Sequence, residues 1–77
     1  MNKERRKRLS EANGFLEKAL SIITSVADEE RYSLENLPER LQDGSGAEKM
    51  ENIIDLLEEA SDCTENASEI IDEVINM

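Results

Sequence analysis

The sequence predicts an all-helical protein: an antiparallel two-helix hairpin of the coiled-coil type with a long Pro/Gly corner. Two regions repeat apolar residues at alternating spacings of three and four, which is the pattern of a helical seam. Between them lies "NLPERLQDGSG", residues 36–46, with the only Pro and two of the three Gly. We therefore expect one domain, residues 1–77, with helices at 3–34 and 46–76 and a corner at 35–45.

The first predicted helix begins after Asn2, a favourable N-cap residue. Asn13 and Gly14 form a turn signal in other settings, and Gly inside a helix costs about 1 kcal/mol relative to Ala. We keep one continuous helix and place both residues on its outer side. The predicted seam contains Leu9, Ala12, Leu16, Ala19, Ile23 and Val26.

The second predicted helix starts at a capping box formed by Ser45 and Glu48. Before it, Pro38 disfavours helical geometry at the preceding residue, so the first helix has to end there. We expect a short helical turn from Pro38 to Leu41 to fold over the end of the hairpin. The seam of the second helix is predicted to contain Met50, Ile53, Leu57, Ala60, Thr64, Ala67, Ile71 and Val74.

Further apolar residues flank both seams and make the apolar stripe too wide for a helix pair. A stripe of this width is typical of a helix with two neighbours. The single Cys also excludes an intramolecular disulfide as a source of stability. We expect a homo-oligomer, a dimer or higher, with two hairpins in a four-helix bundle; the alternative is a loosely packed monomer. The flanking residues are Phe15, Leu20, Ile22, Ala27, Ile54, Leu56, Ile70 and Ile75.

Small and polar side chains dominate the middle of the second helix, residues 60–68, which we call the waist. Two interpretations remain open. Phe15 and Leu16 of the first helix fill the waist, with Cys63 packed inward. Alternatively, the waist lines a cavity at a subunit interface, where the hydroxyls of Ser61, Thr64 and Ser68 contact a ligand.

The net charge of −10, from 19 acids and 9 bases, disfavours nucleic acid and anionic lipid as direct partners. No apolar run is longer than three residues, and the basic start is not followed by the apolar stretch of a signal peptide. We expect a cytoplasmic protein without membrane contact. The most suitable partner is a protein with a basic surface.

Nine acids and no base follow Lys49 in the second helix, and we predict that they form an outer ridge. The ridge either solvates the helix or docks into a basic cleft, as a mimic of a nucleic acid duplex would. The predicted partner-binding residues are Glu51, Asp55, Glu58, Glu59, Asp62 and Glu65.

Residues 1–8 hold five bases and one acid, and we call them the basic head. The basic head either offsets the negative end of the second helix or binds an anion through Arg5, Arg6 and Arg8. An alternative site for a nucleotide or another small anion combines these arginines with the waist hydroxyls. Because the chain has no His, we expect neither an enzyme nor a metal site, and no cofactor.

The stretch "ADEERYSLENLPERLQDGSGAEKMENIIDLLEEA" resembles small acidic helical-hairpin proteins of phages and prophages of Gram-positive bacteria. These proteins share an acidic helix end, a Leu-Pro-Glu corner and a Gly-flanked cap before a Glu-rich helix. The matching residues are Asp28 to Glu30, Asn36 to Glu39, Leu41, Gln42 and Gly46 to Met50.

This resemblance covers about half of the chain and implies an origin in a mobile element, without defined active residues. It favours a counter-defence inhibitor that blocks a host protein through the acidic face. An oligomeric sponge that sequesters a nucleotide signal is the first alternative, and a structural or assembly module is the second.

Overall fold

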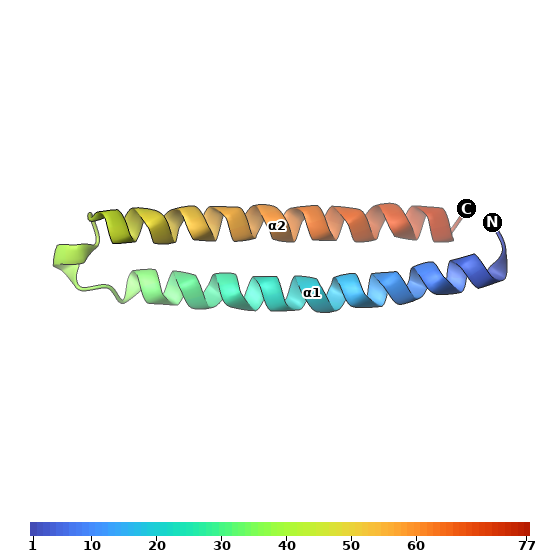
Figure 1. Ribbon diagram of the computed structural model, residues 1–77, viewed down its shortest axis with the longest axis horizontal. Coiled ribbons are helices and arrows are strands. Elements are labelled where there is room, and N and C mark those ends of the chain that lie inside the picture. The colour runs from blue at the N-terminus through green and yellow to red at the C-terminus, as the bar shows by residue number, and fades with distance from the viewer.

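The computed structural model describes residues 1–77 as two long antiparallel helices joined by a short corner (Figure 1). Helix α1 spans Lys3–Glu35, the 3-10 helix η1 spans Glu39–Leu41, and α2 spans Ser45–Ile75. Both termini lie at the end opposite the corner. The expected all-helical hairpin is confirmed, and each long helix begins and ends within one residue of the predicted bounds.

The hairpin is much more elongated than an average domain of its length. Its Cα atoms extend over 59 × 14 × 12 Å, and their radius of gyration is 17.5 Å. A compact domain of this length has a radius of gyration of about 11.5 Å. Only Ala27, Ala47 and Ile54 are buried apolar residues, and no large side chain is fully buried. The core is therefore a single line of contacts between two helices.

The ends of α1 are capped by asparagines. Asn2 is extended, and its Oδ1 accepts a hydrogen bond from the backbone N–H of Arg5 at 2.8 Å, which confirms the predicted N-cap. At the other end, the side-chain Nδ2 of Asn36 donates to the carbonyl of Tyr32 at 2.7 Å. The backbone N–H of Asn36 donates to the same carbonyl at 3.1 Å, so the side chain adds a second hydrogen bond at the helix end.

The corner contains the predicted helical turn, closed by a hydrogen bond from the N–H of Leu41 to the carbonyl of Pro38. The predicted capping box is wrong, because α2 begins one residue earlier than expected. Gly44 is the N-cap, and Ser45 already has helical geometry, so no side chain caps this end. The corner covers the hairpin only in part, since Leu41 stays 46% exposed.

The seam between the helices is rotated relative to the predicted one. The predicted and observed seams share every second member, such as Leu16 and Leu57, which are half-buried. The members between them differ: Val26 is exposed, whereas its neighbour Ala27 is buried. The observed seam consists of Leu9, Asn13, Leu16, Leu20, Ile23, Ala27, Glu30 and Leu34 in α1, and Ala47, Met50, Ile54, Leu57, Ser61, Thr64, Ser68, Ile71 and Ile75 in α2.

Asn13 lies in this seam and not on the outer side of α1, which corrects the sequence-based placement. It is 7% exposed, and its Nδ2 donates to the carbonyl of Ser68 at 3.3 Å and to Oδ1 of Asp72 at 2.8 Å. Its own Oδ1 has no hydrogen-bond partner. A polar residue at a seam position selects one alignment of two helices at some cost in stability. Gly14 lies beside it on the exposed side, with no atom within 4 Å of where a Cβ would stand.

Neither long helix combines the length and the apolar character that crossing a bilayer requires.

Replacing Asn13 tests whether it aligns the helices at the expense of stability. We expect Asn13→Leu to raise the free energy of unfolding by about 1 kcal/mol, because an apolar side chain replaces one with an unpaired buried oxygen. Asn13→Asp is the matched opposite, since it places a second carboxylate beside Asp72 and should lower stability. Urea unfolding followed by circular dichroism, at one fixed protein concentration, measures both. A less stable Asn13→Leu protein would contradict this account.

Candidate functional site

The hairpin has two chemically different faces, one on each side of the seam. We label the seam positions a and d, with Ala27 and Ile54 both at a. The ion pair between Arg31 of α1 and Glu58 of α2 then joins two e positions across the helices. The e and b positions of both helices therefore share one face, which we call the acidic face. The g and c positions share the opposite face.

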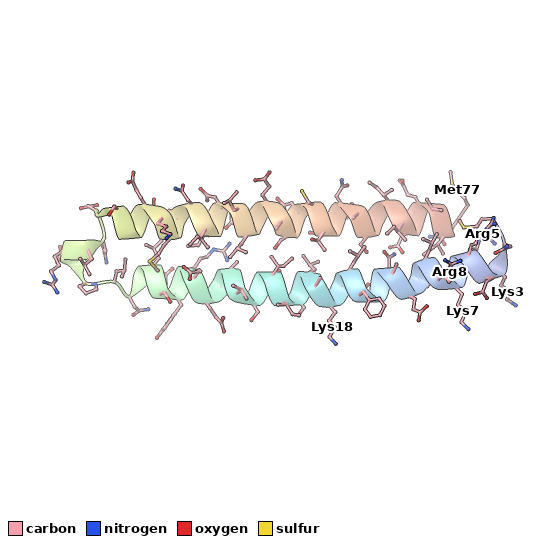
Figure 2. The ribbon with its side chains drawn as sticks, in the orientation of Figure 1. Lys3, Arg5, Lys7, Arg8, Lys18 and Met77 are labelled. Atoms are coloured by element: carbon pink, nitrogen blue, oxygen red, sulfur yellow. The ribbon has the colours of Figure 1, made fainter.

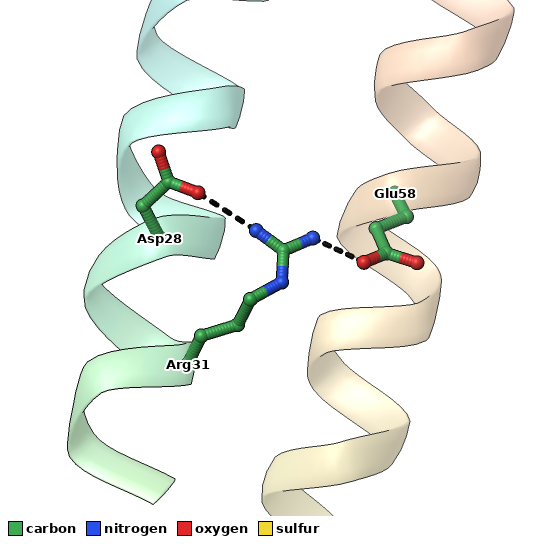
Figure 3. Close-up of polar contacts among 3 residues, drawn as sticks. All are labelled: Asp28, Arg31 and Glu58. Atoms are coloured by element: carbon green, nitrogen blue, oxygen red, sulfur yellow. Dashed lines mark hydrogen bonds and ion pairs between the residues drawn. The ribbon is translucent and has the colours of Figure 1, made fainter. Parts of the chain in front are cut away.

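Arg31 is the centre of the polar contacts on the acidic face (Figure 3). One nitrogen of its guanidinium donates to Asp28, one turn earlier in α1, at 2.7 Å, and the other donates to Glu58. The hydrogen bond to Glu58 is the main cause that raises the pKa of Arg31 above its ordinary value. The guanidinium therefore stays charged to a higher pH than a free one. Its contribution to stability is fully present below the ordinary pKa and is lost only as the pH rises through the higher folded pKa.

The acidic face holds most of the residues predicted to bind a partner. Glu51, Glu58 and Glu65 occupy e positions beside the seam, and Asp55 and Asp62 occupy b positions further out. Glu59 is at f, which points away from α1. The prediction of a purely outer ridge is thus wrong for the e positions, because Glu58 and Asp72 reach across to α1. All six predicted residues are exposed.

Most of the negative charge on α2 has no cation beside it. The helix contains ten acids and one base, whereas α1 contains seven of each. The only two ion pairs of the chain both involve Arg31. Of the predicted central contacts, Glu58 is therefore already engaged, and Glu59, Asp62 and Glu65 are free to meet cations of another molecule.

The opposite face is apolar, and we call it the apolar face. Within the helices, its most exposed large side chains are Phe15 and Ile22 of α1, at 70% and 57%, and Leu56 and Ile70 of α2, at 64% and 51%. Between these c positions lie half-buried g positions that are small or apolar. The apolar face consists of Ala12, Phe15, Ala19, Ile22 and Val26 in α1, Ile53, Leu56, Ala60, Cys63, Ala67, Ile70 and Val74 in α2, and Met77 just beyond the end of α2.

Two predictions about the waist are corrected by this arrangement. Phe15 does not fill the waist of its own hairpin, because the ring lies on the apolar face. Cys63 is exposed on the same face and is not packed inward. Sequence reasoning grouped Leu20, Ala27, Ile54 and Ile75 with these exposed residues, although they belong to the seam. Leu56, Cys63, Ile70 and Met77 recur every seven residues, and this spacing was the sequence signal for an apolar stripe separate from the seam.

The basic head lies at the end of the hairpin where Met77 also lies (Figure 2). Arg5 and Arg8 line an open hollow of about 470 Å³ together with Met1 and Leu9. No carboxylate forms an ion pair with either arginine. Arg6 is half-buried at the end of the seam, and its Nε is shielded without a hydrogen-bond partner.

The waist hydroxyls and the basic head do not meet within one hairpin. Asp72 contacts Asn13, so the head lies beyond that level, while Ser61 is about 16 Å back along α2. The hydroxyl of Thr64 donates to the carbonyl of Ala60 at 2.7 Å, within its own helix. Ser61 and Ser68 are half-buried in the seam. No three Cys, Asp or Glu side chains are grouped so that they could hold a metal ion.

Comparison of the chain with protein-family models, curated proteins and solved structures finds no match. The resemblance to small phage proteins therefore stays a prediction.

Because most acids of α2 have no cation beside them, we expect salt to stabilise the protein. Like charges three and four residues apart in a helix repel, and salt screens this repulsion. We expect the melting temperature to rise by several degrees between about 20 mM and about 500 mM NaCl. Glu59→Gln, which removes one of the repelling charges, should make the rise smaller. A melting temperature that falls with salt would show that attractive pairs such as Arg31–Glu58 outweigh the repulsion.

Proposed function

We propose that this chain is a non-enzymatic binding protein of the cytoplasm whose acidic face blocks a basic surface of a host protein. The observation that carries the proposal is the segregation of charge. Acids without cations gather on one face of α2, while the apolar side chains occupy the opposite face. A surface of this kind attracts and orients a positively charged partner over distances near the Debye length, about 8 Å at physiological salt.

The predicted phage resemblance adds the biological context of a counter-defence inhibitor. An inhibitor of this type needs no catalytic group, because covering the partner's functional surface is sufficient. Glu59, Asp62 and Glu65 are the central contacts in this proposal. Glu58 has a different role, since its bond to Arg31 holds α2 against α1 and positions the neighbouring acids.

We also propose that the active form is a homo-oligomer in which two hairpins form a four-helix bundle. The isolated hairpin exposes 6026 Å², whereas a compact protein of 8.7 kDa exposes roughly 4,700 Å². The excess of about 1,300 Å² reflects the elongated shape, which leaves the apolar face exposed, and large exposed apolar patches are typical of interaction sites. Association leaves the acidic faces on the outside, where each can bind a partner.

Neutralising the acidic face tests the inhibitor proposal. The variant Glu59→Gln, Asp62→Asn, Glu65→Gln should lose most partner binding, because the partner's cations no longer meet opposite charges. The measurement is capture of host proteins on the immobilised protein, with identification and quantification by mass spectrometry. Binding to the unchanged protein should also weaken steeply with salt.

The matched control removes the same number of acids from α1 at f and c positions, outside the acidic face, as Glu4→Gln, Glu11→Gln, Glu29→Gln. This control should retain the captured partner, and both variants should keep the helical circular dichroism spectrum. If the two variants capture the same proteins as the unchanged chain, the acidic face is not the contact surface.

A second candidate function is a sponge for a nucleotide or another small anionic signal. It is favoured by one observation, the hollow that Arg5 and Arg8 line at the end of the hairpin. Two guanidinium groups without carboxylate partners suit phosphate oxygens. If this function is correct, the waist hydroxyls of Ser61, Thr64 and Ser68 contribute only where a second copy brings them close.

Native mass spectrometry of the protein purified from its own host separates the two candidates. We expect about twice 8.7 kDa with no retained guest if the protein is an inhibitor that has lost its partner. A guest of a few hundred daltons that disappears in the variant Arg5→Ala, Arg8→Ala would support the sponge instead. The acidic-face variant serves as the control, because it should not change the retention of such a guest.

A further inference from the structure

We infer that two copies of this chain pack apolar face against apolar face and point in the same direction. Helix α1 of each copy then covers α2 of the other, and the two basic heads lie at the same end. The inference rests on the association proposed above and specifies its geometry. On α2 the face runs from Ile53 to Val74, about 32 Å, and on α1 from Ala12 to Val26, about 21 Å. Together with Arg5 and Arg8, which continue the face on α1, strips of this length and about 10 Å width bury roughly 600 Å² per copy, the lower end of the range for stable complexes.

The charge of α2 slightly favours this orientation over the reversed one. In a four-helix bundle with its twofold axis parallel to the helices, the two α2 helices lie diagonally, about 14 Å apart. If one copy were reversed, the two α2 helices would be neighbours at about 10 Å. Each α2 has ten acids and one base, and eight of these acids lie on the outward acidic face, so salt screens most of the repulsion and the closer approach adds only a small cost. Each α1 has equal numbers of both signs and separates them.

Side-chain size favours the same orientation. Asn13 contacts Ser68 and Asp72, so Phe15 and Ile22 of α1 lie level with the waist of α2. Because both copies point the same way, these two large side chains also lie level with the waist of the other copy. There they meet the small c and g residues Ala60, Cys63 and Ala67, and large side chains fill the space that small ones leave. In the reversed orientation the two waists would face each other and leave a gap.

The ends of the hairpin are compatible with this packing. Arg5 and Arg8 occupy g and c positions, so they extend the apolar face at the end with the termini. In the inferred dimer they lie over the C-terminal end of the other copy's α2, whose last turn contains no base. Cations are favourable beside the free carbonyls of a helix C-terminus. The reversed packing also pairs opposite charges at its ends, so the ends alone do not choose between the two.

Spin labels at outward f positions of the two helices measure the orientation directly. Tyr32 is 70% exposed at an f position of α1, and we use Tyr32→Cys in a Cys63→Ser background, with a nitroxide attached. Parallel copies should give a label-to-label distance of about 30–35 Å by double electron–electron resonance, and reversed copies about 45 Å. Asn52→Cys in the same background repeats the measurement on α2, with the same expected pair of distances.

Sedimentation equilibrium on Phe15→Glu and its matched control Ser25→Glu tests the interface itself. The unchanged protein should have about twice the chain mass of 8.7 kDa, and Phe15→Glu should be a monomer, because a charge replaces the exposed ring of the apolar face. Ser25→Glu, at an outward position, should remain dimeric. A dimer with the shorter distances supports the inference. A dimer with the longer distances overturns the orientation alone, and a monomeric or larger unchanged protein overturns the dimer as well. Partner capture by the acidic face is measured separately, so its failure is distinguishable from these outcomes.

Discussion

Each helix of this hairpin has one neighbour but carries apolar side chains over an arc wide enough for two. The seam uses the a and d positions, and it buries mostly small residues such as Ala27 and Ala47. The larger side chains Phe15, Ile22, Leu56 and Ile70 are left on one side, because the hydrogen-bonded polar contacts hold the other side. Burial of the remaining apolar area is therefore the requirement that connects fold, assembly and the location of the acidic face.

The alignment of the two helices depends on a few polar contacts. The side-chain Nδ2 of Asn13 donates to Ser68 and Asp72 across the seam, and Arg31 bridges the helices to Glu58 nearer the corner. Both sets of contacts involve e positions of α2, so they also determine which side of the hairpin is acidic. A rotation of α2 by one position would break these contacts and turn acids toward the apolar face. Contacts that add little stability on an exposed surface can thus decide which surface is presented.

The sequence was sufficient to predict the helices, their ends, the Asn2 cap and the turn in the corner, because these depend on local residue preferences. It was not sufficient to choose the seam. The d positions, such as Leu16 and Leu57, belong to two overlapping apolar repeats. Together with the a positions they form the observed seam, and together with the g positions they form the predicted one. Periodicity treats both alike, and the polar Asn13 argued for the wrong one. The bond between Asn13 and Asp72 spans 59 residues, so no local pattern could reveal it.

The two chain ends lie side by side, at the opposite end from the corner (Figure 1). In the inferred dimer all four chain ends gather there, while the corners and the acidic faces stay clear of them. A short linker from Met77 of one copy to Met1 of the next can therefore join both hairpins into one polypeptide of four helices. Gene duplication offers the same route in evolution, and each half of the duplicated chain would then be free to change its acidic face for a different partner.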